Sequence, residues 1–370
     1  MKVFVTGTRG IPDIPGGVEK HCQELYPLIA ESGHEIFLST RKPYVTLRNP
    51  SWKKVNLVHT YAPRRKSLEA IVHTFLSVIK ARRINPDIIH IHAVGPGLMV
   101  PFARILGLNV VVTNHGPDYD RQKWGIVAKT MLRAGEFLGC SFANEIIVIS
   151  NVIKNIVKNR CGRESQLIYN GVELPEKSDD FDFLKKIGSV KGDYILAVCR
   201  FVPEKGLDLL IKAFQLIKTD CKLVIAGDAD HETPYSRNIR ELSEKDDRII
   251  LTGYIVGEDL RQVYSHARLF VLPSYHEGLP IALLEAMSYG LSVLVSDIPA
   301  NLEVGLEKDR YFQCGDIDDL RKKVEIQLEK QMTDAEKYAI KNMISVRYNW
   351  NIIARQTIAV YQKATDNTAK

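Results

Sequence analysis

The sequence predicts an α/β protein built from two doubly wound, Rossmann-like domains that face a central cleft. The 370-residue chain is too long for one hydrophobic core and long enough for two. Short runs rich in Val and Ile alternate with helical patterns, first in the N-terminal half and again in the C-terminal half. Several of these runs are apolar throughout, as parallel strands covered on both faces are. Two such series predict two doubly wound sheets, with ligands beyond the carboxyl ends of the strands.

The first series predicts an N-terminal domain over residues 1–175. Strands are expected at 2–6, 35–40, 55–59, 87–91, 109–113, 145–149 and 166–169. A helix is expected between the first two strands, because one helical face is formed by Val18, Cys22, Leu25 and Ile29. Gly33 ends this helix.

A charged stretch without periodicity, residues 175–182, predicts a linker before a second domain over residues 193–345. Its strands are expected at 194–198, 222–226, 248–252, 268–272 and 292–296. The last helical pattern, residues 346–366, follows the second series. We expect this helix to cross back and join the N-terminal domain.

The composition indicates a cytoplasmic protein. Six cysteines are scattered without a Cys-x-x-Cys pair, which argues against a zinc site or a disulfide framework and favours a reducing compartment. No apolar run approaches the roughly 20 residues that a membrane span needs. The N-terminal residues predict a β-strand rather than a signal peptide.

The basic residues are concentrated in the first half of the chain. Residues 1–175 hold 23 Lys and Arg against 13 Asp and Glu, whereas the remainder carries a small acidic excess. A basic surface attracts a phosphorylated substrate, an anionic membrane or nucleic acid. No nucleic-acid-binding module is recognisable, so nucleic acid is not an expected partner.

A glycine-rich turn joins the first strand to the first helix, in Gly7-Thr-Arg-Gly-Ile-Pro-Asp-Ile-Pro-Gly16-Gly17. Such a turn lets backbone N–H groups and a helix N-terminus approach a phosphate, although glycines also serve tight turns. The dinucleotide fingerprint Gly-x-Gly-x-x-Gly is absent. The opening residues and Tyr119-x-x-x-Lys123 also fit a short-chain dehydrogenase, but one Rossmann domain leaves the second series unexplained.

The most informative segment is Glu277-Gly278-Leu279-Pro280-Ile-Ala-Leu-Leu-Glu285, which ends in Ala-Met-Ser-Tyr-Gly290. Pro280 fits the first helical position, and Gly290 fits the position after the helix. Glu285 lies among apolar residues in the second turn. A carboxylate there is costly to desolvate unless it is hydrogen-bonded, and the hydroxyls of a sugar or ribose are suitable donors.

Two cations and a histidine follow strand ends. Arg200 and Lys205 come after the strand that opens the second domain, beside Gly206, and together suit a diphosphate. His115 follows the strand that ends at Thr113, where it can hydrogen-bond a sugar hydroxyl or serve as a structural loop residue.

Metal binding is not expected. His90 and His92 share one strand face, but no third ligand is evident, so we interpret them as core or cleft-wall residues. Asp-x-Asp, which binds a metal and diphosphate in other transferases, occurs three times without a common context. A cationic pair neutralises a diphosphate without a metal.

These segments together resemble the family 4 glycosyltransferases, which are retaining enzymes of the GT-B fold. The family's Glu-x₇-Glu motif matches Glu277 and Glu285, its Arg–Lys pair matches Arg200 and Lys205, its glycine turn matches Gly16-Gly17, and its His-Gly matches His115-Gly116. The opening residues and the stretch from Asp118 to Gly125 look like a rhamnosyltransferase-like subgroup. Here Cys199 precedes Arg200 where the family often has Gly.

The resemblance implies a role for each residue in binding a nucleotide-diphosphate sugar. Glu277 and His115 would contact the donor sugar, and Glu285 would bind the ribose. Arg200, Lys205 and the N–H groups of Gly16, Gly17, Gly278 and Leu279 would bind the diphosphate. Tyr254 would lie near the base. Asp118 and Arg121 would lie on the acceptor side. No metal and no other cofactor is implied.

The acceptor implied is a saccharide, expected to be lipid-linked, as in the assembly of surface polysaccharide. Residues 68–80 form an apolar helical pattern between Arg64-Arg65-Lys66 and Arg82-Arg83, which fits either a buried helix or contact with the inner face of an anionic membrane. Two alternatives remain open at this point: a sugar-nucleotide epimerase of the same fold and an NAD(P)-dependent dehydrogenase.

Overall fold

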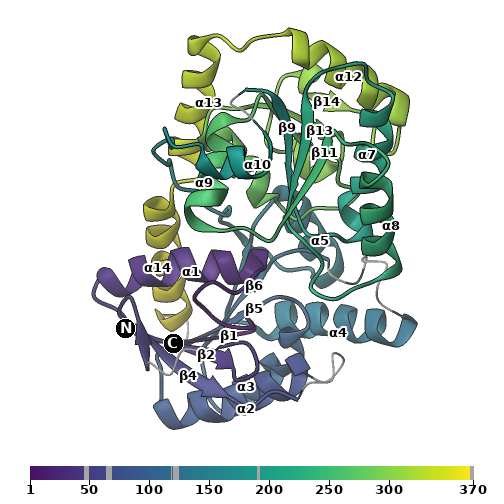
Figure 1. Ribbon diagram of the computed structural model, residues 1–370. Helices are drawn as coiled ribbons and strands as arrows, with labels where there is room; N and C mark the ends of the chain where they lie inside the picture. The colour runs from purple at the N-terminus through teal and green to yellow at the C-terminus, as the bar shows by residue number, and fades with distance from the viewer. Residues whose placement is uncertain (46–49, 64–68, 118, 120–124, 190–191, 367–370) are drawn as a thin grey trace. The chain divides into compact units, whose positions relative to one another are not determined.

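The computed structural model describes residues 1–45, 50–63, 69–117, 119, 125–189 and 192–366. The chain divides into two compact units, each with its own parallel sheet. Unit 1 comprises Met1–Gly171 and Tyr348–Lys370, and unit 2 comprises Val172–Arg347. The predicted fold class, two Rossmann-like α/β domains, is confirmed (Figure 1).

Unit 1 contains an eight-stranded sheet in the order β3-β4-β2-β1-β5-β6-β7-β8. All neighbours pair in parallel except β3 and β4. The strands are β1 (Lys2–Thr6), β2 (Glu35–Arg41), β3 (Ser51–Trp52), β4 (Val55–Thr60), β5 (Ile88–His92), β6 (Val110–Asn114), β7 (Glu145–Val148) and β8 (Gln166–Leu167).

Helices cover both faces of this sheet. The helices are α1 (Gly17–Glu31), α2 (Glu69–Ile84), α3 (Val100–Ile105), α4 (Ile126–Phe142), α5 (Asn151–Cys161) and α14 (Trp350–Asp366), with a 3₁₀ turn η1 (Pro96–Met99). α1 and α14 pack against each other on one face, whereas α2, α3 and α4 lie on the other (Figure 1). Cys22, Leu25 and Ile29 of α1 are fully buried, as their spacing predicts, and they share a core with Trp350 and Tyr361.

Unit 2 contains a six-stranded, fully parallel sheet in the order β11-β10-β9-β12-β13-β14. The strands are β9 (Tyr194–Val198), β10 (Lys222–Ala226), β11 (Ile249–Gly253), β12 (Leu269–Leu272), β13 (Ser292–Ser296) and β14 (Tyr311–Phe312). Every strand expected from the sequence forms within two residues of its predicted bounds. The two-residue strands β3 and β14 were not expected.

The helices of unit 2 also lie on both faces of its sheet. They are α6 (Asp182–Lys186), α7 (Leu207–Gln215), α8 (Pro234–Ser243), α9 (Gly257–His266), α10 (Ile281–Ser288), α11 (Pro299–Leu302), α12 (Ile317–Glu329) and α13 (Asp334–Arg347), with 3₁₀ turns η3 (Pro203–Lys205) and η4 (Lys308–Arg310). α7, α8 and α12 lie on one face, and α9, α10 and α13 lie on the other (Figure 1).

The second unit starts earlier than the expected residue 193, because the segment read as a linker is fastened to it. The Ser178 backbone N–H donates to Ser265 Oγ at 2.9 Å, and the Phe183 N–H donates to Gln262 Oε1 at 2.9 Å. Both acceptors lie on α9, so the segment packs as part of unit 2. No helix in the described part of the chain is long and apolar enough to cross a membrane.

Candidate functional site

The glycine-rich turn of unit 1 contains one glycine, Gly16, whose backbone conformation disfavours a side chain. Gly16 has φ +145°, and an added Cβ would lie 2.1 Å from Glu19 Oε2. It is the N-cap of α1, and no side chain of the described residues caps this end of the helix. At Gly17, the first helical residue, an added Cβ would meet none of the described residues within 4 Å. The N-terminus of α1 thus presents backbone N–H groups, as an anion site requires.

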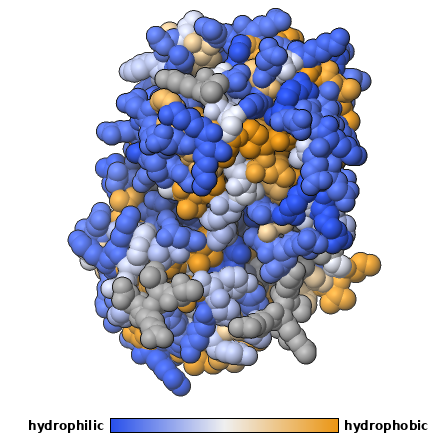
Figure 2. Space-filling model, in the orientation of Figure 1, coloured by the Kyte–Doolittle hydropathy of each residue, from blue (hydrophilic) through white to orange (hydrophobic). Residues whose placement is uncertain are grey.

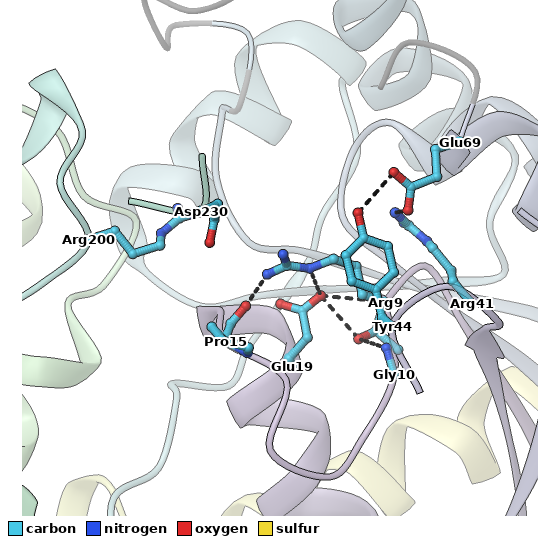
Figure 3. Close-up of polar contacts among 10 residues, drawn as sticks. Arg9, Gly10, Pro15, Glu19, Arg41, Tyr44, Glu69, Arg200 and Asp230 are labelled. Carbon is cyan, nitrogen blue, oxygen red and sulfur yellow. Dashed lines mark hydrogen bonds and ion pairs between the residues drawn. The ribbon is translucent and has the colours of Figure 1, made fainter. Parts of the chain in front are cut away.

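An ion pair that the sequence analysis missed holds this turn in place. The Arg9 backbone N–H and side-chain Nε both donate to Glu19 Oε1, at 3.0 and 3.2 Å. Arg9 also donates to the carbonyl of Pro15, so the side chain spans the turn (Figure 3). A carboxylate in the first turn of a predicted helix is a recognisable signal for such a contact.

A second polar group fastens the end of β2 to α2. Arg41 Nη1 donates to Glu69 Oε1 at 3.0 Å, and the Tyr44 hydroxyl donates to Glu69 Oε2 at 3.2 Å (Figure 3). Arg41 and Glu69 are both buried. Two donors satisfy the buried carboxylate, and its charge is paired, as burial requires.

His115 lies in a cluster of buried aromatic and histidine side chains at the ends of β5 and β6. His115 Nε2 is 2.9 Å from His92 Nδ1, and the two rings stack with centroids 5.2 Å apart. The His21 ring meets the His115 ring edge-on at 5.0 Å, and His21 Nδ1 is 2.9 Å from Asn170 Oδ1. Gly7 permits this packing, because an added Cβ would lie 2.1 Å from the carbonyl oxygen of His92.

Burial keeps these histidines neutral. Desolvation lowers the pKa of His21 to about 4 and that of His90 to about 3. It also lowers the pKa values of His92 and His115 well below their ordinary value, with a further contribution from the neighbouring histidines.

The cluster corrects one expectation about metal ligands. The sequence offered no third ligand beside His90 and His92, whereas the structure places one nitrogen each of His21, His92 and His115 within 4.8 Å of one another. His90 is outside this trio. The His92–His115 hydrogen bond at 2.9 Å engages one nitrogen of each of these rings, and the other His92 nitrogen lies 2.5 Å from the Tyr26 hydroxyl.

The acceptor-side residues Asp118 and Arg121 lie outside the described residues. Their neighbour Tyr119 is fully buried, and its hydroxyl donates to Glu136 Oε2 at 2.9 Å. Glu136 also accepts from Asn114 at 3.0 Å and from Arg160 at 3.1 Å. Tyr119 therefore fastens the segment after β6 to α4, a structural role that differs from that of a dehydrogenase tyrosine.

In unit 2 the structure brings Lys205 and Glu277 together. Lys205 Nζ lies 2.5 Å from Glu277 Oε1, and the Ser274 hydroxyl donates to the same oxygen at 2.7 Å. Gly206 allows this approach. It has φ +63°, and an added Cβ would lie 2.3 Å from the carbonyl oxygen of Pro273. The turn after β9 thereby lies against the end of β12.

Arg200 also pairs with a carboxylate. Its Nη1 lies 2.9 Å from Asp230 Oδ2, and the remaining guanidinium N–H groups leave further donors (Figure 3). Asp228 pairs with Arg240 at 2.6 Å. Both carboxylates of this Asp-x-Asp sequence thus have an arginine as partner.

Glu285 lies on α10 and accepts from Tyr264 at 3.1 Å through Oε2. Tyr264 is buried and stacks on Tyr289 with centroids 5.2 Å apart. Burial and the Glu285 charge raise the pKa of Tyr264, so its hydroxyl stays a donor. The expected hydrogen-bonded carboxylate is present, and a protein tyrosine is one of its donors.

Gly278 and Leu279 lead into the N-terminus of α10, which no side chain in the described part of the chain caps. Pro280 is the N-cap rather than the first helical residue, because its ψ of 107° is extended. Gly290 follows the helix with φ +69°, as its position predicts. Tyr254, just after β11, is 54% exposed and thus accessible to a ligand.

Comparisons with known proteins agree with this architecture. Residues 179–345 match the family model "Glycosyl transferases group 1", and residues 15–176 match "Glycosyltransferase Family 4". An uncharacterized glycosyltransferase from Methanocaldococcus jannaschii is 24% identical, with 99% of each chain covered. The serotype-specific mannosyltransferase WbdA of Escherichia coli is 29% identical over 54% of this chain and 24% of its own length.

Solved structures share the fold over the whole chain. Sucrose-phosphate synthase from Thermosynechococcus elongatus superposes with a TM-score of 0.85 at 19% identity, covering 99% of each chain. Anabaena HepE in complex with UDP-glucose superposes with a TM-score of 0.78 at 17% identity, covering 100% of this chain and 99% of that one.

The chain forms two units with largely parallel sheets, and it matches glycosyltransferase family models and solved structures. Together these findings define a glycosyltransferase of the GT-B fold. The two family models together span nearly the whole chain, and with the glycosyltransferase relatives they support a glycosyltransferase of family 4.

Proposed function

We propose that the enzyme is a retaining glycosyltransferase that moves a hexosyl or rhamnosyl residue from a nucleotide-diphosphate sugar to a saccharide acceptor. The acceptor is lipid-linked, and the reaction belongs to the assembly of a surface polysaccharide. Retention and the rhamnosyltransferase-like alternative rest on the resemblance of the motifs. The structure of HepE with UDP-glucose supports a nucleotide-sugar donor.

The observation that carries the proposal is the Lys205–Glu277 pair at 2.5 Å. Both side chains are largely buried, and the ammonium keeps two further N–H donors for a diphosphate. Fixed cations stabilise the departing diphosphate, and a carboxylate beside the sugar stabilises an oxocarbenium-like transition state. One pair thus supplies both charges that the transfer of a sugar requires.

The remaining donor contacts follow from the same assignment. Arg200 and the N–H groups of Gly16, Gly17, Gly278 and Leu279 bind the diphosphate. Glu285 binds the ribose, Tyr254 lies near the base, and His115 contacts the donor sugar. The reaction needs no metal, because the cations of the chain neutralise the leaving group.

The names of relatives support an acceptor in glycan assembly. One is a putative teichuronic acid biosynthesis glycosyltransferase of Bacillus subtilis, which is 27% identical over 64% of this chain and 58% of its own length. Another is human phosphatidylinositol N-acetylglucosaminyltransferase, one chain of which is 24% identical over 95% of this chain and 74% of its own length. Asp118 and Arg121 would contact the acceptor.

Unit 1 carries a surface suited to an anionic membrane at the cytoplasmic face. Among the described residues, three of the most exposed apolar side chains lie on α3 and α4: Ile105 (81%), Ile126 (85%) and Val127 (75%). Figure 2 shows a hydrophobic patch where the outer end of α4 reaches the surface. The exposed Arg82, Arg83 and Arg133 lie on α2 and α4. Exposed apolar and basic side chains on these helices fit the boundary of an anionic bilayer.

α2, which the sequence suggested for this contact, buries several polar side chains and exposes an apolar one. Its polar residues Glu69, His73 and Ser77 are buried, and Ser39 bonds to the last two. Phe75 is exposed and stacks on Phe102 of α3 at 5.2 Å. α2 therefore adds Phe75 to the surface of α3 and α4 rather than forming it alone.

A panel of nucleotide sugars, with purified lipid-linked oligosaccharides as acceptors, tests the function. We expect one donor to give a glycosylated product with retained configuration, unaffected by EDTA. The same donor incubated without acceptor should stay unchanged, since formation of an epimer would identify the alternative enzyme. A change in nicotinamide absorbance, or failure of every donor to bind, would refute the assignment.

Flotation with vesicles containing phosphatidylglycerol tests the membrane contact. We expect the protein to float at low salt, and Val127→Asp to weaken flotation. Tyr338→Asp provides the control, because Tyr338 is similarly exposed at 73% but belongs to unit 2. Equal flotation of both variants and the wild type would exclude α4 as the contact.

A further inference from the structure

A continuous hydrogen-bonded chain runs through the core of unit 1 and ends at His115. It begins at Thr113, whose Oγ1 lies 2.7 Å from His90 Nε2. His90 Nδ1 lies 2.9 Å from the Tyr26 hydroxyl and 2.7 Å from the Tyr361 hydroxyl. The Tyr26 hydroxyl lies 2.5 Å from His92 Nε2, and His92 Nδ1 lies 2.9 Å from His115 Nε2. Apart from His115, which is half-buried, every member is fully buried or nearly so.

The contacts of His90 favour one direction of this chain. A nitrogen lone pair accepts one hydrogen, whereas an N–H can donate to two oxygens in a three-centre bond. When His90 Nδ1 carries the hydrogen, it donates to both hydroxyls, and these also lie close enough to interact with each other. His90 Nε2 then accepts from the Thr113 hydroxyl. The hydrogen of the Tyr26 hydroxyl is left for His92 Nε2, the shortest contact of the chain.

The positions of the remaining hydrogens follow because His92 and His115 are neutral. Burial lowers the pKa values of His92 and His115, so each ring carries one hydrogen. Because His92 Nε2 accepts from Tyr26, its hydrogen is on Nδ1 and donates to His115 Nε2. The single hydrogen of His115 is then on Nδ1, which has no hydrogen-bond partner among the described residues.

We propose that Tyr26 is a positioning residue that acts through His92 to hold His115 as the Nδ1–H tautomer, so that His115 presents an N–H donor to an oxygen of the donor sugar. If the hydrogen bonds ran in the reverse direction, His115 Nδ1 would present a lone pair and would accept a hydrogen from a sugar hydroxyl. The part concerning the sugar rests on the proposed function, whereas the tautomer itself is independent of it.

The tautomer is measured by long-range ¹H–¹⁵N NMR on protein with ¹⁵N-labelled histidine, in which the signals of His115 are identified by their loss in His115→Asn. We expect Nδ1–H in the wild type and loss of that preference in Tyr26→Phe. Tyr361→Phe is the matched control. It removes the other hydroxyl at His90 but none at His92, so His115 should keep Nδ1–H.

Kinetics provide the second measurement. Tyr26→Phe should raise KM for the donor about fivefold, the worth of one hydrogen bond, with little change in kcat, whereas Tyr361→Phe should match the wild type. Tryptophan fluorescence confirms that the variants fold, because Trp52, Trp124 and Trp350 all belong to unit 1.

Three results would overturn the proposal: an Nε2–H tautomer of His115 in the wild type, an unchanged tautomer in Tyr26→Phe, or one equivalent of tightly bound metal on His21, His92 and His115. If the tautomer is as expected but His115→Ala leaves KM for the donor unchanged, the proposed role of His115 fails while the hydrogen-bonded chain stands.

Discussion

Lys205 Nζ lies 2.5 Å from Glu277 Oε1, although the two residues are 72 positions apart in the sequence. The carboxylate is the counterion of the ammonium. The two groups should therefore affect the binding of a nucleoside diphosphate in opposite directions.

We expect Lys205→Ala to weaken the binding of the donor's nucleoside diphosphate about 10- to 100-fold, because it removes a hydrogen bond from a charged donor. Glu277→Gln should leave this binding unchanged or tighter while abolishing transfer. Titration calorimetry with the free diphosphate measures both. Equal weakening by both variants would show that the pair is structural.

Glu285 should be specific for the ribose of the donor. Its carboxylate accepts from Tyr264 through one oxygen and can accept ribose hydroxyls through its other lone pairs. The wild type should bind a 2′- or 3′-deoxy analogue about tenfold more weakly than the parent nucleotide. Glu285→Ala should bind the analogue and the parent nucleotide with the same, reduced affinity. Tyr264→Phe is the control that disturbs Glu285 without removing the carboxylate. If Glu285→Ala still bound the deoxy analogue about tenfold more weakly than the parent nucleotide, another residue would bind the ribose.

Gly206→Ala should disturb Lys205 without touching a ligand. The new Cβ would meet the Pro273 carbonyl oxygen at 2.3 Å, and φ +63° adds strain. We expect a loss of stability well above the roughly 1 kcal/mol of left-handed strain alone, together with weaker diphosphate binding.

Gly305→Ala provides the comparison for that experiment, since Gly305 has φ +80° but an added Cβ would meet no described residue within 4 Å. It should lose about 1 kcal/mol and keep its affinity for the diphosphate. Thermal unfolding by calorimetry and the same titration measure both variants. Similar losses in the two would mean that the turn after β9 adjusts to the added methyl group.

The sequence predicted the sheets well because buried parallel strands are apolar along their whole length, and this pattern needs no knowledge of the partner strand. The two-residue strands β3 and β14 carry no such pattern. Lys205 and Glu277 were expected as site residues. Their ion pair was not, because it depends on the contact of Gly206 with Pro273 across the sheet.

The histidine cluster shows the same limit. His90 and His92 were visible on one strand, but their partners come from α1, β6 and α14. The helical face formed by Cys22, Leu25 and Ile29 places Tyr26 beside the core, and that was an available signal. Which donor meets which nitrogen depends on the packing of three elements, and no spacing in the sequence reveals it.

The buried histidines should make unit 1 sensitive to mild acid. Burial lowers the pKa of His21 to about 4 and those of His73 and His90 to about 3 in the folded protein, against 6.5 when unfolded. Below pH 6.5 the unfolded chain binds protons that the folded chain does not, so the free energy of unfolding falls as the pH is lowered towards the folded values. At pH 5 each histidine should cost about 2 kcal/mol relative to pH 7.5.

Urea unfolding followed by tryptophan fluorescence measures this loss in unit 1, which contains all three tryptophans. His73→Gln isolates one histidine, since glutamine does not titrate. At pH 7.5 the variant should be somewhat less stable, because Ser39 loses its contact with the ring at 3.2 Å. Between pH 7.5 and 5 it should regain about 2 kcal/mol relative to the wild type. Parallel stability curves for the two proteins would mean that His73 titrates at its ordinary pKa in the folded state, and therefore that its surroundings admit water.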